Sequence, residues 1–178
     1  MNRMWAVLLV CGMLAAGAMA QTNVYSKNAV GVIRVDVPAN RWTLVSYQLN
    51  PLNTSNRVGE VLGTNGIPDG MVVLLFNGIS YVAEEYIEGD GWVPGTNTLP
   101  RGVGFWMRAP SAFSLYLTGE VPSETNTTVN LPAGYRLVSF PYPVDVPISN
   151  SVLNVVAQDG DTILRFTGTG YEAAEYIE

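Results

Sequence analysis

The chain has 178 residues, a formal net charge of −6, 48% hydrophobic and 13% charged residues, and no histidine. This balance argues against disorder and against binding to nucleic acid or anionic lipid, which needs clustered basic residues. The lack of histidine excludes histidine-based catalytic triads, histidine general bases and histidine-ligated zinc sites.

Residues 1–20 are predicted to be a secretory signal peptide. Arg3 gives a positive start, an apolar run follows, and Ala18-Met19-Ala20 is the small-x-small pattern that signal peptidase cuts. The apolar run is too short to span a bilayer, which takes about 20 residues. Cys11, the only cysteine, follows a bulky residue inside that run, so we do not expect a lipoprotein. We therefore expect a secreted, extracellular or periplasmic protein that begins at Gln21, without disulfides or a transmembrane span.

The mature chain begins with two predicted strands and a short helix. Residues 29–37 alternate apolar and polar side chains, and residues 42–49 form a second strand. Residues 54–63 predict a helix in which Ser55 or Asn56 caps the start and the final glycine marks the end. Its three apolar residues share one face: Val58, Val61 and Leu62.

Strands also account for the residues that follow. The apolar run 71–76 predicts a buried strand, and Asn77-Gly78 leads from it as a tight hairpin into residues 79–87. Two later strands are indicated by alternating apolar residues, at Phe105, Met107 and Ala109 and at Phe113, Leu115 and Leu117.

The sequence then repeats itself at an offset of 90 residues. Residues 69–88 and 159–178 are identical at eleven of twenty positions. Upstream, LVSY at residues 44–47 matches LVSF at residues 137–140, and the helical pattern recurs at residues 148–157. Such a fixed period is the signature of repeated structural units. We predict an all-β protein of two tandem, small, sandwich- or barrel-like modules, each with one short helix.

We place the first module, here called the first copy, at residues 21–122, and the second copy, an incomplete repeat, at residues 123–178. No counterpart of residues 89–122 follows the second copy. We favour truncation of the chain or its gene record as the explanation. The alternative is that another chain completes the sheet by donor-strand addition, although no segment resembles a spare donor strand.

Two motifs carry a resemblance to a known group of proteins. PAGYRLVSFP at residues 132–141 and RGVGFWMR at residues 101–108 resemble the "PAGWNLVSFP … GxGYW" modules of exported, uncharacterised bacterial proteins. In that group the module accompanies larger surface or secreted proteins, so the resemblance implies an exported β-module and brings no catalytic residues. The chain departs from the pattern at Tyr135-Arg136 and carries the closing motif once.

Acidic residues are the remaining candidates for catalysis. Glu84 and Glu88 lie on one face of a predicted strand, roughly 13 Å apart at about 3.3 Å per residue. A glycosidase needs two carboxylates about 5 to 10 Å apart on opposite sides of the substrate bond. We therefore expect no enzyme, no catalytic residue and no cofactor. A carboxylate-dependent glycoside hydrolase is the least favoured alternative.

Calcium is a better match for the acids. Glu88 and Asp90 on one turn, and Asp159 and Asp161 on another, place oxygens close together, as a hard cation prefers. The alignment of Asp69 with Asp159 instead favours a turn that both copies share.

Aromatic residues suggest a sugar-stacking platform, with five candidates: Trp42, Tyr81, Tyr86, Trp92 and Trp106. Tyr81 and Tyr86 recur in the second copy, which favours equivalent packing roles. Trp92 follows Gly89-Asp90-Gly91 on an expected loop, so we take Trp92, Tyr86 and Trp106 as the candidate ligand residues. The predicted function is structural or adhesive, with a cell-surface polysaccharide or protein as partner, and a carbohydrate-binding module is the alternative.

Overall fold

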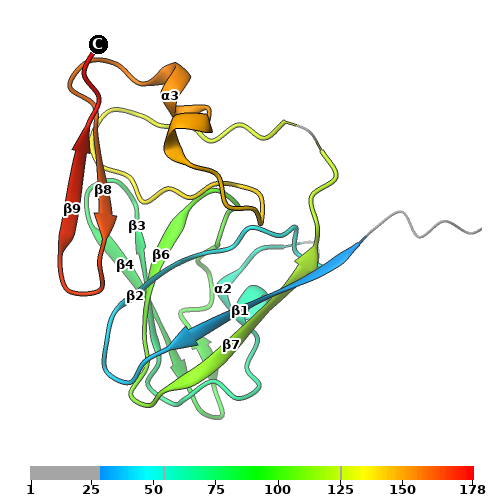
Figure 1. Ribbon diagram of the computed structural model, residues 1–178. Helices are drawn as coiled ribbons and strands as arrows, with labels where there is room; N and C mark the ends of the chain where they lie inside the picture. Colours follow the sequence, from blue (N-terminus) through cyan, green and yellow to red (C-terminus); the bar gives the residue numbers. More distant parts are fainter. Residues whose placement is uncertain (1–28, 54, 125) are drawn as a thin grey trace, which may run out of the picture.

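The computed structural model describes residues 29–53, 55–124 and 126–178 (Figure 1). Strands and bridges account for 39% of the described residues and helices for 8%, so the fold is all-β. The predicted signal peptide and its cleavage site lie outside the described residues. Within the described ranges, no helix combines the length and the apolar character needed to cross a membrane.

Two antiparallel sheets form the first copy. Strands β1 (Val30–Val37) and β7 (Phe113–Glu120) pair with each other. The larger sheet has the order β2-β6-β3-β4-β5. Its strands are β2 (Thr43–Ser46), β3 (Val72–Phe76), β4 (Tyr81–Ile87), β5 (Gly91–Val93) and β6 (Gly104–Arg108). The predicted alternation in β7 is confirmed, because Leu115 and Leu117 are buried while Tyr116 is exposed.

The two sheets are joined by residues 47–50, which follow β2 and lie against β7. Asn50 and Glu120 exchange two backbone hydrogen bonds of 2.9 Å each, and the hydroxyl of Tyr47 donates to a carbonyl of β7 at 2.9 Å. Gly119 permits this approach, because a Cβ there would lie 2.5 Å from the carbonyl oxygen of Asn50. The second predicted strand is therefore shorter than expected, since its last residues join the two sheets.

Helix α2 (Val58–Leu62) packs against β5 and β7 and buries the three apolar residues that the sequence predicted. It ends as expected at Gly63, whose φ is 70° and whose amide donates to the carbonyl one turn back. The predicted cap at Ser55 or Asn56 is wrong. Arg57 occupies the N-cap position, and the Ser55 hydroxyl accepts a bond from the Arg57 amide (3.3 Å) before the helix begins.

Strands β3 and β4 form a hairpin whose loop is wider than the predicted two-residue turn. The loop is Asn77–Ser80, closed by the bond from the Asn77 amide to the Ser80 carbonyl (3.0 Å). The side-chain oxygen of Asn77 accepts bonds from the amides of Ile79 and Ser80, both at 2.9 Å. These bonds stabilise a four-residue loop, because the asparagine side chain takes the place of a backbone acceptor.

The second copy contains an equivalent hairpin, β8 (Thr162–Phe166) and β9 (Tyr171–Glu175), in the same register as β3 and β4. Each hairpin is closed by one amide–carbonyl bond and one amide–aspartate bond. These bonds are Tyr86 to Met71 and Tyr176 to Asp161 (2.8 Å each), then Glu88 to Asp69 (2.8 Å) and Glu178 to Asp159 (3.2 Å). The turn predicted to be shared by both copies is confirmed.

The helical segment of the second copy differs from its prediction. It divides into a 3-10 turn, η1 (Ile148–Asn150), and a short helix, α3 (Leu153–Val156). None of these residues is buried, and Val155 is 80% exposed. The expected apolar face is not covered because, among the described residues, the second copy has no counterpart of the two strands that pack on α2.

Backbone hydrogen bonds attach the second copy to the first at the start of β6. The amide of Gly104 donates to the Leu137 carbonyl, and the amide of Ser139 donates to the Gly102 carbonyl, both at 3.0 Å. The side-chain amide of Gln48 donates to two further carbonyls of the second copy, at 3.0 and 3.1 Å. The segment that matches β2 in sequence therefore pairs with the first copy instead of forming a sheet of its own.

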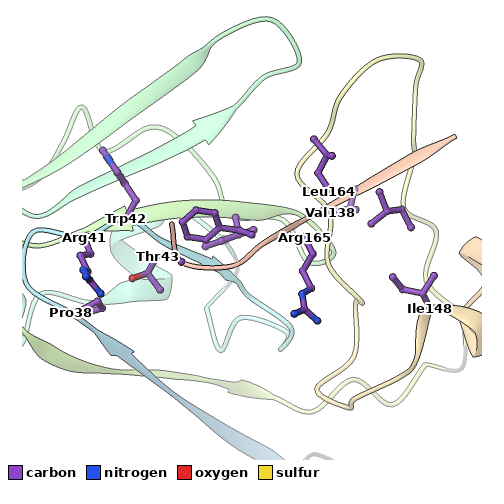
Figure 2. A pocket seen from close by; sticks show the side chains of 12 residues that line it. Pro38, Arg41, Trp42, Thr43, Val138, Ile148, Leu164 and Arg165 are labelled. Carbon is purple, nitrogen blue, oxygen red and sulfur yellow. The ribbon is translucent and has the colours of Figure 1, made fainter. Parts of the chain in front are cut away.

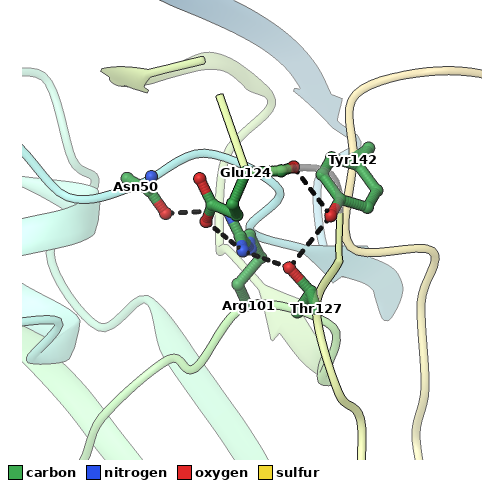
Figure 3. A network of polar contacts seen from close by, with 5 residues as sticks. All are labelled: Asn50, Arg101, Glu124, Thr127 and Tyr142. Atoms are coloured by element: carbon green, nitrogen blue, oxygen red, sulfur yellow. Dashed lines mark hydrogen bonds and ion pairs between the residues drawn. The ribbon is translucent and has the colours of Figure 1, made fainter. Parts of the chain in front are cut away.

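An arginine holds the connecting segment beside this contact (Figure 3). Arg101 donates to the side chains of Asn50 (2.8 Å), Glu124 (2.5 Å) and Thr127 (2.5 Å). Its guanidinium also lies 5.5 Å from the ring centre of Tyr142, whose hydroxyl donates to the Glu124 carbonyl. Because the planar guanidinium of Arg101 bonds to several acceptors and packs on one ring, it fixes the position of the connecting segment relative to the first copy.

Acidification should weaken this attachment. The pKa of Glu124 is lowered from its ordinary value of 4.5, first by its own backbone amide and then by Arg101. A lowered pKa means that the stabilisation is present above the ordinary value and is lost as pH falls through the lowered one. We expect the amide protection factors of Gly104 and Ser139, measured by NMR, to fall below about pH 4.5.

The matched control is Glu124→Gln, which keeps the shape of the side chain and removes its titration. Its protection factors at Gly104 and Ser139 should be lower than those of the parent chain near neutral pH and insensitive to pH in this range. The same pH dependence in both chains would contradict a role for the Glu124 carboxylate.

Candidate functional site

A groove lies between the first copy and the β8 strand of the second copy (Figure 2). Its volume is about 530 Å³. Pro38 and the segment 41–44 form one wall, the segment 163–166 and Gly168 form the other, and Val138 and Ile148 complete the lining. The volume lies within the range of ligand-binding sites, the lining is mostly apolar, and the hollow is open to solvent.

A second hollow of about 410 Å³ adjoins the first and adds aromatic residues. The two share Arg41, Trp42, Phe166 and Gly168. Together they are called the interface groove below. Its aromatic lining comes from both copies: Trp42, Tyr81 and Trp106 from the first, and Phe166 and Tyr171 from the second.

Ring contacts fix the position of the second hairpin on the first copy. Trp106 and Phe166 meet edge to face, with ring centres 4.7 Å apart and an angle of 88° between the planes. Phe166 also packs on Tyr171 at 5.5 Å, as Phe76 packs on Tyr81 at 5.1 Å in the first hairpin. Aromatic pairs in such geometries add to the stabilisation from burial.

Three rings of the interface groove keep much of their surface in solvent. Tyr171 is 56% exposed, Tyr81 48% and Trp42 38%. The guanidinium of Arg108 lies 6.0 Å from the ring centre of Trp42, and Arg41 and Arg165 are exposed at the groove. The arrangement offers ring faces and guanidinium donors to a ligand at the same place.

The structure corrects the prediction that Trp92 lies in a loop. Trp92 belongs to strand β5 and is only 8% exposed, and its indole N–H donates to the Gly63 carbonyl at 2.7 Å. Tyr86 packs on it at 5.6 Å and donates its hydroxyl to the Thr64 carbonyl at 3.1 Å. Both residues therefore hold the end of α2 against the sheet, and neither ring lines the groove.

Trp106 is the one predicted ligand residue that the structure places at the groove. Only 6% of it is exposed, because Phe166 covers its ring. The sequence offers Trp42 and Tyr81 as aromatic candidates without favouring them, and Tyr171 is the counterpart of Tyr81 in the repeat. Only the packing of the two copies brings these three rings together.

The predicted calcium ligands do not converge. Within the described ranges, no three acidic, histidine or cysteine side chains are grouped so that they could hold a metal ion. Asp159 and Asp161 accept bonds from the amides of Glu178 (3.2 Å) and Gln158 (2.9 Å). Glu88 and Asp90 lie in the turn between β4 and β5. Calcium binding at these residues stays a prediction.

Glu84, considered above for catalysis, is buried in the first copy and holds a loop in place. Its side chain is fully buried, and one carboxylate oxygen accepts a bond of 2.6 Å from the amide of Asn97. This bond anchors the connection between β5 and β6. The equivalent residue of the second copy is Ala174, and no counterpart of that connection occurs there among the described residues.

A comparison of the chain with protein-family models, curated proteins and solved structures finds no match. The resemblance to exported bacterial modules therefore stays a prediction that rests on its motif residues. The site is interpreted from its own geometry, which is an apolar groove with aromatic walls and exposed guanidinium groups.

The two tryptophans Trp92 and Trp42 should differ in their effect on stability. Trp92→Ala removes a buried ring and leaves the Gly63 carbonyl without its donor, so we expect a loss of about 3 to 5 kcal/mol. Trp42→Ala removes a partly exposed ring, so we expect a loss below about 1 kcal/mol. Urea denaturation of both variants measures these changes. Equal losses would contradict the assignment of one ring to the core and the other to the groove.

Proposed function

We propose that this chain is a secreted or surface-exposed, non-catalytic interaction protein of two tandem β-modules, residues 21–122 and an incomplete second module at residues 123–178. The proposal is carried by the interface groove, a ligand-sized hollow whose walls come from both copies. The recurrence of the same hairpin bonds in each copy supports the tandem arrangement. The resemblance to exported bacterial modules supports the location and a structural or adhesive role.

The residues of the groove favour binding over catalysis. Its described lining contains arginines as the only charged side chains, and it contains no serine. Glycoside hydrolysis needs two opposed carboxylates, and the acidic residue considered first for that role, Glu84, is engaged in the core. A partner would thus be held at this groove without being cleaved.

Export is tested by the mass of the mature protein after expression of the full chain in a bacterial host. We expect a product that begins at Gln21, because cleavage follows Ala20. Ala20→Arg should block cleavage, since the peptidase needs a small residue there, while the matched variant Ala20→Ser should be processed. An intact, unprocessed parent chain in the cytoplasm would refute the export part of the proposal.

Carbohydrate binding is the second candidate, and the three exposed rings around the interface groove favour it. Sugars present apolar faces that pack on aromatic rings and hydroxyl groups that accept bonds from guanidinium donors. Trp42 and Tyr81 supply the rings from the first copy, and Tyr171 supplies one from the second. These three rings take the place of Trp92 as the candidate sugar-binding residues, because the ring of Trp92 is buried.

A pull-down on insoluble polysaccharides tests this candidate. We expect retention of the parent chain, retention by Trp42→Phe, and loss by at least tenfold for Trp42→Ala, with the fold of each variant checked by circular dichroism. Ring stacking is worth about 0.5 to 1.5 kcal/mol beyond the apolar area that the ring buries, and tenfold in affinity corresponds to about 1.4 kcal/mol, so loss of both contributions accounts for the expected effect. Equal retention of the parent chain and Trp42→Ala would remove the groove as a sugar site.

A further inference from the structure

We propose that the edge of β8 that faces away from β9 is a docking site for an extended strand of another chain, and that this strand resembles β6 in sequence. The inference rests on the proposed function, because it names the partner that the interface groove would hold. Four observations support it. Strand β8 has an open edge, and in the first copy β6 covers the equivalent edge of β3. The groove lies along the open edge, and the charges of the hairpin and of β6 are complementary.

Strand β8 has a backbone edge without a strand partner. Among the described residues β8 pairs only with β9. Hydrogen-bonded residues alternate along an antiparallel strand, and the flanking residues Asp161 and Thr167 bond toward β9. The backbone groups of Thr162, Leu164 and Phe166 therefore point to the opposite side. An open edge of this kind is a template for pairing with another strand.

The first copy shows which strand covers the equivalent edge. There β3, the counterpart of β8, pairs on that side with β6. Val72 lies opposite Arg108 and Leu74 opposite Trp106. The counterparts of Val72 and Leu74 are Thr162 and Leu164, and both hairpins have the same internal register. A strand with the pattern of β6 would therefore place its tryptophan opposite Leu164.

The interface groove runs along this same edge. Residues 163–166 of β8 line its larger part, and Tyr171 is the one residue of β9 that lines the smaller part. In Figure 1, β8 lies toward the body of the molecule and β9 lies outside it. Leu44 and Val138, which are 37% and 42% exposed, form apolar surface across the groove from β8. A docked strand would find backbone partners on one side and apolar contacts on the other, as in strand-addition complexes.

Charge favours the same partner. Residues 159–178 contain five acidic residues and one arginine, whereas residues 101–110, which include β6, contain two arginines and no acid. In the five-stranded sheet of the first copy, Glu85 of β4, Val72 of β3 and Arg108 of β6 lie in one row. Glu175 and Thr162 begin the same row in the second hairpin. A β6-like strand would complete it with a basic side chain, and complementary charge promotes encounter and fixes register.

The test uses a fluorescent peptide with the sequence of residues 101–110, RGVGFWMRAP, added to the purified mature chain. Fluorescence anisotropy should report saturable binding that a scrambled peptide of the same composition does not show. Leu164→Pro removes an amide that points away from β9, so the hairpin keeps its own bonds. We expect this variant to bind about tenfold more weakly and the matched Leu164→Val to bind as the parent chain does.

The peptide itself provides the control for backbone pairing. In the first copy, the backbone groups of Trp106 and Arg108 face β3, and those of Phe105 and Met107 face β2. N-methylation at the positions of Trp106 and Arg108 should abolish binding, whereas N-methylation at those of Phe105 and Met107 should weaken it far less. Equal effects of the two modifications, binding by the scrambled peptide, or no binding would overturn the inference. Retention on a polysaccharide with no peptide binding would leave the proposed function standing and remove the strand partner.

Discussion

Strand β6 provides the backbone hydrogen bonds on which the rest of the structure depends. It pairs with β2 on one side and with β3 on the other. At the start of this strand, residues 102–104 pair with residues 137–139 of the second copy. Phe105, Trp106 and Met107 are all buried, so this strand is covered on both faces. Backbone groups that leave water must find partners, and β6 supplies them to three segments that are far apart in the sequence.

This dependence explains the contrast between the two copies. In the first copy β3 lies between β4 and β6, and α2 is covered by β5 and β7. In the described part of the second copy, β8 has one neighbour, and every residue of β9 and most residues of α3 are exposed. The hairpin keeps its internal bonds because these are local. The surfaces that would need a further strand stay accessible, and the interface groove is one of them.

The contact between the copies combines a few polar bonds with one ring pair. Arg101 and the backbone bonds to Gly102 and Gly104 hold the connecting segment, while Trp106 and Phe166 hold the hairpin. Each neutral hydrogen bond contributes about 0.5 to 1.5 kcal/mol, and bonds to charged groups contribute more. These contacts hold the two walls of the groove in place. The lining residues between the contacts stay accessible to a ligand.

Strands β1 and β7 could be predicted from the sequence, because the alternation of apolar residues in them reflects burial of one face of the pair. The repeat likewise predicted that Asp69 and Asp159 share a turn. The burial of Trp92 could not be predicted, since its partner is the Gly63 carbonyl at the end of α2. The groove was missed for a similar reason: its walls lie more than 100 residues apart in the sequence.

Amide hydrogen exchange, measured residue by residue with NMR, tests most directly whether β8 has an open edge that takes a strand. In the free chain, the Leu164 amide should exchange much faster than the Leu74 amide, although the two occupy equivalent positions. Addition of the peptide of residues 101–110 should slow exchange at Leu164 and leave Leu74 unchanged. Equal protection of both amides in the free chain, or no change at Leu164 with the peptide present, would contradict the account.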